Sequence, residues 1–82
     1  MQVEIYSSDD YAGMVSGKLS FYYGYEEADE DDHWCFIAKE NGQEKFRKTT
    51  KEIEDSLGKE GWNLRDPKDY LLAGIAIYLL LR

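Results

Sequence analysis

A single histidine and a single cysteine, His33 and Cys35, are the residues of this chain best suited to nucleophilic catalysis. Their i, i+2 spacing places both side chains on one face of a β-strand. Such a pair becomes reactive only where the thiol pKa is lowered and a third group orients the histidine, and the sequence offers no residue for either role. We interpret Cys35 as a buried structural residue beside a histidine at the rim of a sheet, and we expect no enzymatic activity.

The sequence has no pattern typical of a cofactor or metal site. Its glycines fit no phosphate-binding loop, and its histidine, cysteine and carboxylates lack the spacing of metal ligands. Calcium is disfavoured as well, because the Asp-x-Asp-x-Asp-Gly pattern of a calcium loop is missing. A lone cysteine excludes an intramolecular disulfide. We therefore expect neither a cofactor nor a metal.

Residues 26–32 form an acidic run with six carboxylates in seven residues. These are Glu26, Glu27, Asp29, Glu30, Asp31 and Asp32. In an extended conformation the run spans roughly 23 Å, or about one charge per 4 Å. A DNA strand has a similar density, with one phosphate per roughly 3.4 Å. Two interpretations stay open: the run mimics a phosphate backbone, or it is a solvated loop that only increases solubility.

The acidity of the chain is concentrated in its first part. The 82 residues have a net charge of −7, yet residues 1–32 contain nine acidic residues and one basic residue, a net charge of −8. Residues 33–82 contain eight acidic and nine basic residues, a net charge of +1. Negative charge disfavours direct binding to nucleic acid or to an anionic membrane. An asymmetry of this kind indicates a basic partner instead.

Five of the seven tyrosines also lie within residues 1–32, and Tyr22, Tyr23 and Tyr25 come just before the acidic run. Tyr22 and Tyr23 point to opposite sides of a strand, so we expect at least one of them to face solvent. Tyrosine is enriched among the residues that dominate binding energy at interfaces. It also fills ordinary positions in small sheets, and both roles stay open.

Alternating apolar and polar residues predict four strands, and two capped segments predict two helices. Residues 7–13, between the first two strands, have the composition of a turn. The expected strands cover residues 2–6, 17–25, 33–40 and 43–48, and the expected helices cover residues 50–58 and 67–81.

The dipeptide Asn41-Gly42 predicts a two-residue hairpin turn between the last two strands, because both turn positions need a positive φ. Counting outward from the turn gives the pairs Lys39–Glu44, Ile37–Phe46 and Phe36–Arg47. In this register Phe46 shares a face with Cys35 and Ile37, and Arg47 can stack on Trp34 or Phe36. Since the third strand is apolar on both faces, the face away from the helices needs long side chains, a loop or another molecule to cover it.

Two capping signals set the expected helix boundaries. Thr49 and Glu52 match a capping box that opens the first helix, and Gly58 is expected to end it. Asp66-Pro67 matches the start of the second helix. The elements together predict a single α+β domain over residues 1–82, an antiparallel sheet of three to four strands with two C-terminal helices packed on one face.

Residues 70–81 contain no charge, but twelve residues are well short of the roughly 20 that a bilayer span needs. We expect no membrane insertion. The segment is expected to pack centrally on the sheet and to leave any remaining face available to a partner or a second copy.

Three segments give the chain a resemblance to known proteins: GKLSFYYGYEE at 17–27, HWCFIAK at 33–39 and YLLAGI at 70–75. In these segments it resembles the small acidic proteins that phages and prophages encode, including anti-CRISPR and anti-restriction proteins. The resemblance is to the class, so no functional residue is carried over from it. It implies a protein that acts by binding in a bacterial host cytoplasm. The first five residues also lack the basic and apolar regions of a signal peptide, which favours the cytoplasm.

We therefore expect a small acidic phage- or prophage-derived protein that inhibits a nucleic-acid-handling host defence protein by occupying its basic surface. The expected partner is a basic nucleic-acid-binding host protein or effector complex. The expected contacts are the six carboxylates of residues 26–32 together with Tyr22, Tyr23 and Tyr25. The alternative is a structural or assembly protein that acts as a homo-oligomer, such as a homodimer, through residues 70–81 or the spare face of the third strand.

Overall fold

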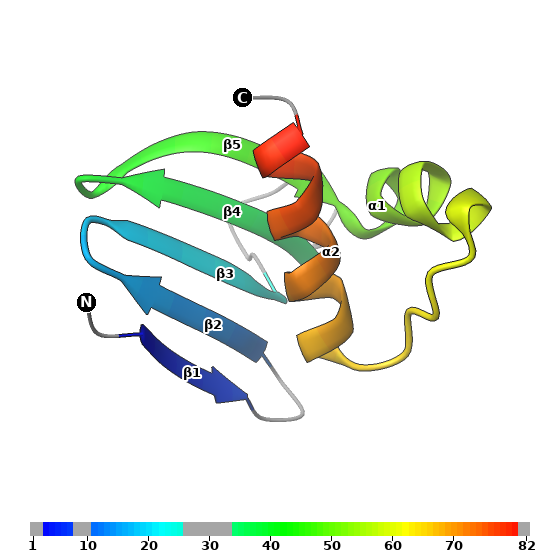
Figure 1. Ribbon diagram of the computed structural model, residues 1–82, viewed down its shortest axis with the longest axis horizontal. Coiled ribbons are helices and arrows are strands. Elements are labelled where there is room, and N and C mark those ends of the chain that lie inside the picture. The colour runs from blue at the N-terminus through cyan, green and yellow to red at the C-terminus, as the bar shows by residue number, and fades with distance from the viewer. Residues whose placement is uncertain (1–2, 8–10, 26–33, 81–82) are drawn as a thin grey trace.

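The computed structural model describes residues 3–7, 11–25 and 34–80, and the side chains within 11–25 and 34–80. Five strands come first in the chain and two α-helices follow, with a short 3₁₀ helix between them (Figure 1). The strands are β1 (Val3–Ser7), β2 (Tyr11–Ser16), β3 (Leu19–Tyr25), β4 (Trp34–Glu40) and β5 (Gln43–Thr49). The helices are α1 (Thr50–Leu57), the 3₁₀ helix η1 (Gly58–Glu60) and α2 (Pro67–Leu80).

Each strand pairs antiparallel with the next one along the chain, so the strand order in the sheet is the order in the sequence. Antiparallel strands followed by helices make the fold α+β, which confirms the predicted class. The predicted number of strands is too low, because β2 begins inside the segment 7–13 that has the composition of a turn. In β2, Gly13 lies opposite Tyr22 and Met14 opposite Phe21. Pairing with β1 on one side and β3 on the other outweighs the weak local strand preference of this segment.

The turn between β4 and β5 has the predicted conformation. Asn41 and Gly42 both have positive φ, 55° and 81°. Next to the turn, Lys39 lies opposite Glu44, as the hairpin register predicts. Both turn residues therefore adopt the backbone that an Asn-Gly hairpin favours.

Further along the hairpin the predicted register is wrong. A β-bulge shifts the pairing by one residue, so that Ala38 faces Phe46 and Ile37 faces Arg47. Phe46 therefore joins the helix-covered face, where its ring meets that of Phe36 edge to face at 6.1 Å. Arg47 moves to the opposite face, away from the aromatic rings on which the predicted register would stack it.

The helix starts are as predicted, and the backbone conformation at the end of α1 differs from the expected one. At the start of α1, Glu52 N donates to Thr49 Oγ1 and Thr49 N donates to the Glu52 carboxylate, which confirms the capping box. α1 ends at Leu57 with Gly58 as its C-cap, as predicted, but Gly58 keeps a right-handed backbone with φ −59° instead of the left-handed one usual for a terminating glycine. The chain continues through η1 to Gly61, whose φ of 88° gives the left-handed termination. α2 begins at Pro67, as predicted.

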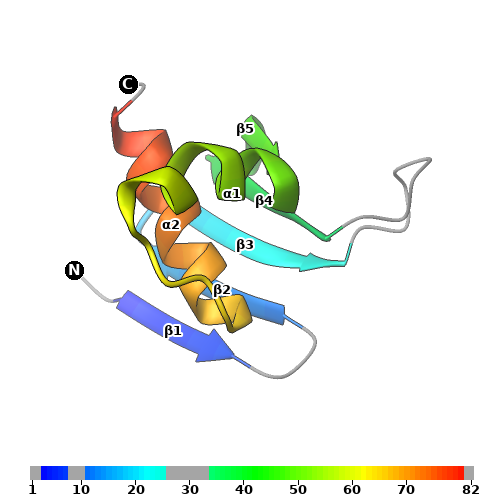
Figure 2. The same ribbon diagram turned by 90° about the vertical axis from the view of Figure 1, so that its right-hand side faces the viewer.

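α2 crosses one face of the sheet, and α1 lies beside it beyond the end of β5 (Figure 2). Gly74 lets α2 approach closely, because a Cβ there would lie 2.8 Å from Cδ2 of Phe36 and nearer still to two other atoms of that ring. α1 adds Ile53 and Leu57 to the same core. The buried core consists of Ala12, Phe21, Tyr23, Phe36, Ala38, Ile53, Leu57, Leu71, Ala73, Ile77 and Tyr78.

α2 is 14 residues long. Within the described part of the chain, no helix has both the length and the apolar character needed to cross a membrane.

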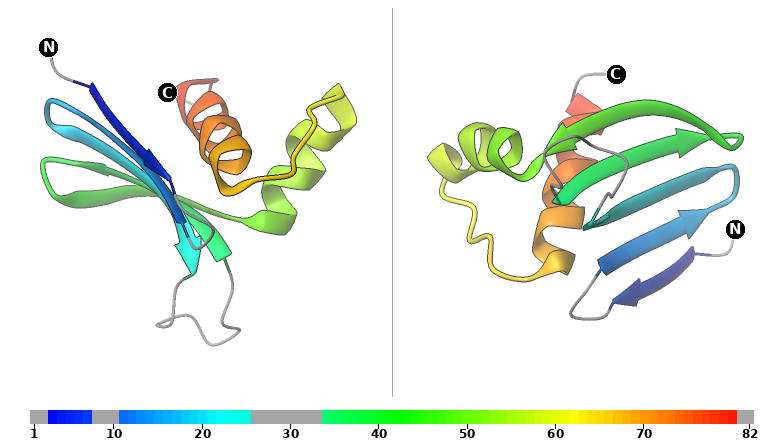
Figure 3. Two further views of the ribbon diagram at one scale, coloured as in Figure 1. Left: turned by 90° about the horizontal axis from the view of Figure 1, so that it is seen from below. Right: turned by 180° about the vertical axis from the view of Figure 1, so that it is seen from behind.

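Among the described elements, no helix covers the other face of the sheet, called here the open face (Figure 3). Cys35 and Ile37 are nevertheless buried on it. Arg47 reaches this face after the bulge, and its Nη1 donates to Cys35 Sγ at 3.5 Å. On the neighbouring strands the rings of Tyr11 and Tyr22 stack at 6.1 Å. Long side chains thus help to cover the open face, one of the possibilities that the sequence leaves open.

Candidate functional site

The acidic run lies outside the described residues, as does His33. Its six carboxylates are Glu26, Glu27, Asp29, Glu30, Asp31 and Asp32. Two of the predicted tyrosine contacts have surface that a partner can reach. Tyr22 is half-buried on the open face, and Tyr25 is 44% exposed at the end of β3.

Tyr23 is only 3% exposed, which corrects its prediction as a surface contact. It lies on the helix-covered face, where its ring stacks on that of Tyr70 with a centroid distance of 5.0 Å. The Trp34 ring lies 5.4 Å from Tyr23 at a tilt of 44°. The Tyr23 hydroxyl is hydrogen-bonded to Thr50 Oγ1 at 2.6 Å. Tyr23 therefore belongs to the core and joins β3 to both α1 and α2.

Tyr23, Trp34 and Tyr70 line a cavity of about 630 Å³ between the sheet, α1 and the start of α2. Its remaining lining side chains are polar and come from the end of β5 and the first turns of α1: Thr49, Thr50, Lys51 and Glu54. A smaller cavity of about 250 Å³ touches the same three rings and is also lined by Arg65 and Pro67. Aromatic walls with a few convergent polar groups are typical of binding sites, and the larger volume is in the usual range.

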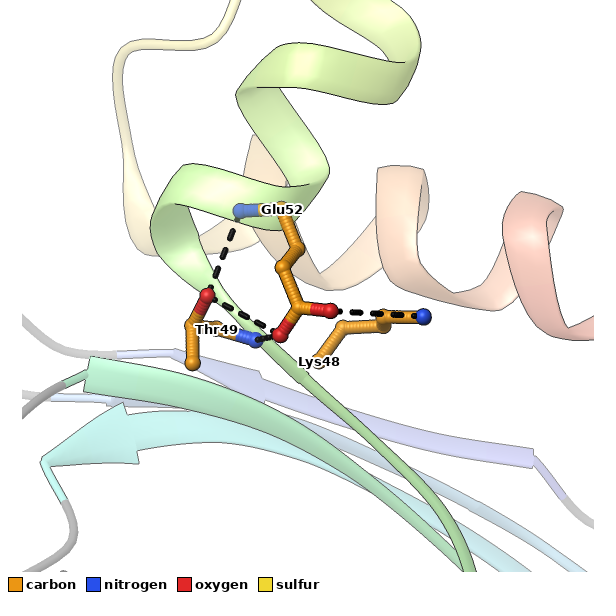
Figure 4. A network of polar contacts seen from close by, with 3 residues as sticks. All are labelled: Lys48, Thr49 and Glu52. Atoms are coloured by element: carbon orange, nitrogen blue, oxygen red, sulfur yellow. Dashed lines mark hydrogen bonds and ion pairs between the residues drawn. The ribbon is translucent and has the colours of Figure 1, made fainter.

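The capping box formed by Thr49 and Glu52 fixes where α1 begins (Figure 4). The start of α1 in turn sets the positions of Lys51 and Glu54, which line the cavity. Glu52 N donates to Thr49 Oγ1 at 3.2 Å, and Thr49 N donates to Glu52 Oε1 at 3.1 Å. Lys48 Nζ lies 3.4 Å from the other carboxylate oxygen. The backbone N–H of Thr49 contributes most to holding the pKa of Glu52 below its usual range.

The hydroxyl groups of Tyr70 and Thr50 form hydrogen bonds at the polar side of the cavity. Tyr70 Oη donates to Glu54 Oε1 at 2.7 Å, and Thr50 Oγ1 donates to the Trp34 carbonyl at 3.1 Å. Burial, followed by the bond to the Glu54 carboxylate, raises the pKa of Tyr70 to about 12. Burial also raises the pKa of Tyr23. At neutral pH Tyr70 is therefore protonated and remains a donor to Glu54.

The sheet topology brings the attachment points of the acidic segments to one end of the sheet. Because the strands alternate in direction, the β1–β2 and β3–β4 connections both leave the sheet at the end where β5 runs into α1. Residues 3–7, 11–25 and 34–80 contain nine acidic and nine basic residues, a net charge of zero. The net charge of −7 thus belongs to the rest of the chain, where Asp9, Asp10 and the acidic run contribute eight negative charges.

Cys35 is buried, as the sequence predicts. In the described ranges, no three His, Cys, Asp or Glu side chains come together in a way that could hold a metal ion.

The sequence patterns do not reveal the cavity. Its lining comes from β3, β4, the β5–α1 junction and α2, and Trp34 and Tyr70 are 36 positions apart. The capping box does indicate where α1 begins, but no local pattern shows which surface that turn faces. Tyr70 and Glu54 are therefore functional candidates that only the packed structure brings together.

Comparison with known proteins adds no relative: no family model, no curated protein and no solved structure matches this chain.

Proposed function

We propose that this chain is a small acidic binding protein that inhibits a nucleic-acid-handling host defence protein by occupying its basic surface. The observation that carries the proposal is the separation of charge. The described part of the chain is neutral, and the strongly acidic segments attach at one end of the sheet. The acidic run has about as many negative charges per unit length, if extended, as a DNA strand has phosphates. A protein surface that binds a phosphate backbone could therefore bind the acidic run in its place. The resemblance to phage-encoded anti-CRISPR proteins implies the same mode of action.

The acidic run and the neighbouring tyrosines have different roles in this proposal. Charge complementarity mainly speeds association and selects the partner. Affinity comes chiefly from aromatic side chains that lose water on binding. Tyr25 suits this role because it is 44% exposed and directly precedes the acidic run. Tyr22 adds aromatic surface on the opposite side of β3, on the open face.

The proposal is tested by affinity capture from a bacterial lysate at low and high salt, with mass spectrometry of the retained proteins. A variant with all six carboxylates of residues 26–32 changed to the corresponding amides is compared with the wild type. We expect nucleic-acid-binding proteins to be retained by the wild type at low salt, and to be lost at high salt and by the variant.

The matched control changes acids elsewhere: Asp55→Asn with Glu60→Gln, both exposed on α1 and η1. This control is expected to retain the same proteins as the wild type. Retention that survives both high salt and the loss of the six carboxylates contradicts the proposal.

A second candidate function, self-association, is favoured by the outer surface of α2. Leu72, Leu79 and Leu80 are 43%, 55% and 79% exposed. Leu72 and Leu79 are two helical turns apart, so they lie on one side of α2. In this case light scattering at high micromolar concentration detects a dimer, and Leu72→Gln with Leu79→Gln returns the chain to a monomer. If the chain is strictly monomeric at that concentration, self-association is excluded as its function.

A further inference from the structure

The 630 Å³ cavity has the aromatic surface that a cation can use. Trp34 and Tyr70 are both partly exposed, and Tyr23 lies in ring contact with each of them. The π face of an aromatic ring attracts a positive charge, most strongly for tryptophan. Guanidinium groups use this attraction more often than ammonium groups, because they are planar, weakly hydrated and able to stack on a ring.

Glu54 supplies a negative charge at the same cavity. Tyr70 Oη donates to its Oε1 at 2.7 Å, which restrains the carboxylate beside the rings. Within the described residues its second oxygen, Oε2, has no hydrogen-bond partner. A guanidinium group stacked on an aromatic ring can donate to that oxygen.

Among the described residues, Lys51 is the basic residue that lines this cavity, and Arg65 lines the smaller cavity beside the same rings. Lys51 lies three positions before Glu54 on α1, so the cavity carries both signs of charge at its polar side. A cationic ligand is opposed by Lys51 and attracted by Glu54, and an anionic ligand has the reverse preference. The two residues therefore provide a test of the sign of the ligand.

The position of the cavity connects it to the proposed partner. Trp34 is the first residue of β4, and Thr49 and Thr50 lie where β5 runs into α1. These residues belong to the end of the sheet at which the acidic segments attach. A basic protein drawn to that end brings its own arginine side chains to the cavity.

We propose that the cavity lined by Trp34, Tyr70 and Glu54 takes the guanidinium group of an arginine side chain from the partner. This inference rests on the proposed function, because it names the chemistry by which the basic partner is anchored. The acidic segments select and attract the partner, and the cavity holds one arginine by ring stacking and a carboxylate contact.

The probe is N-acetylarginine amide, titrated into the full chain while tryptophan fluorescence is followed. Trp62→Phe is used as the background, so that the signal comes from Trp34 alone. We expect saturable binding of the arginine amide that is tighter than that of N-acetyllysine amide. Equal or tighter binding of the lysine amide, or no saturable change with the arginine amide, overturns the proposal.

Charge variants give the sign of the ligand. Glu54→Gln is expected to weaken binding of the arginine amide about two- to fivefold, the size of a partly exposed ion pair, and Lys51→Met to strengthen it by a similar factor. The matched controls are Asp55→Asn and Lys59→Met, exposed residues that do not line the cavity. Circular dichroism confirms that each variant is folded. The opposite order of effects identifies an anion site and overturns the proposal.

The same titration in the variant that lacks the six carboxylates separates this inference from the proposed function. If this variant binds the arginine amide but no longer captures the partner, the cavity proposal is supported, and partner capture depends on the acidic run. Partner capture without any binding of the arginine amide overturns the cavity proposal alone. Weaker binding of the arginine amide by Glu54→Gln in the otherwise wild-type chain, together with weaker partner capture, supports the proposal. Weaker binding of the amide with unchanged partner capture overturns the assignment of the cavity to an arginine of the partner.

Discussion

Tyr70 connects the core to the polar side of the cavity. Its ring stacks on the buried Tyr23, and its hydroxyl donates to Glu54 at 2.7 Å. Because burial disfavours a charged phenolate, and a phenolate would also face the Glu54 carboxylate, the neutral form is favoured and the pKa of Tyr70 rises to about 12. The same contact that restrains Glu54 therefore makes the stability of the fold depend on pH in the alkaline range.

The expected sign of this pH dependence follows from the two protonation states. The pKa of Tyr70 is about 10 in the unfolded chain and about 12 in the folded one. Below pH 10 both states hold the proton, and the stabilisation is fully present. Between pH 10 and pH 12 the unfolded chain releases its proton first, so the free energy of unfolding falls as the pH rises.

Urea unfolding of the wild type and of Tyr70→Phe, measured from pH 8 to pH 11.5, checks this prediction. Phenylalanine keeps the ring and removes the titrating hydroxyl. We expect the difference in unfolding free energy between the two chains to shrink above pH 10. A difference that stays constant across the range contradicts the assignment of the raised pKa to Tyr70.

At the scale of elements, α1 depends on its capping box. The Thr49 side chain accepts from Glu52 N, and the Glu52 carboxylate accepts from Thr49 N. An eight-residue helix is too short to be stable alone, so its first turn depends on these bonds and on the burial of Ile53 and Leu57.

Thr49→Ala is expected to lower the free energy of unfolding by about 1 kcal/mol, because it removes the acceptor of the helix cap. Urea unfolding at pH 7 measures the change. Thr49→Ser keeps the hydroxyl and is expected to stay within about 0.5 kcal/mol of the wild type. Equal effects of alanine and serine would show that the capping bond adds nothing to stability.

Two glycines give a matched pair for the packing of α2 on the sheet. A Cβ at Gly74 meets the Phe36 ring, whereas one at Gly58 has no atom within 4 Å. Gly74→Ala is expected to destabilise the fold by about 1–3 kcal/mol through overpacking. Gly58→Ala is expected to stabilise it by about 0.4–1 kcal/mol, since the backbone there is already right-handed helical. Thermal unfolding of both variants checks the prediction, and a neutral Gly74→Ala contradicts the close approach of α2 to the sheet.

Local signals predict most elements because they act over a few residues. The turn at Asn41-Gly42, the cap at Thr49 and the helix start at Pro67 each depend on backbone preferences that neighbouring residues set. The bulge in β5 is different, because one extra residue of β5, Lys45, is accommodated between the pairs Lys39–Glu44 and Ala38–Phe46. No sequence pattern marks that position. The shift is settled by Phe46 joining the apolar core and Arg47 meeting Cys35.

The sequence patterns do not predict β2, for a related reason. Its start overlaps residues that favour turns, and Gly13 has little strand preference of its own. Pairing on both sides, with β1 and with β3, supplies the stability that the local sequence lacks.

For the whole molecule, the sequence predicts where along the chain the negative charge lies. It does not predict where in the fold the charged segments attach. The acidic run is visible as a local excess of carboxylates. The convergence of both acidic connections at one end of the sheet requires the strand order, and hence β2. The cavity requires the packing of α2 as well, since Tyr70 is far from Trp34 in the sequence.

The proposed inhibition requires the chain to compete with nucleic acid for a basic surface of the partner. Competition between the chain and labelled duplex DNA for the captured partner, followed by fluorescence anisotropy, tests it most directly. We predict that the chain displaces the DNA completely and that its apparent Kd rises in proportion to the DNA concentration. A ternary complex of partner, DNA and chain, with the anisotropy of the bound DNA unreduced, would contradict the proposal.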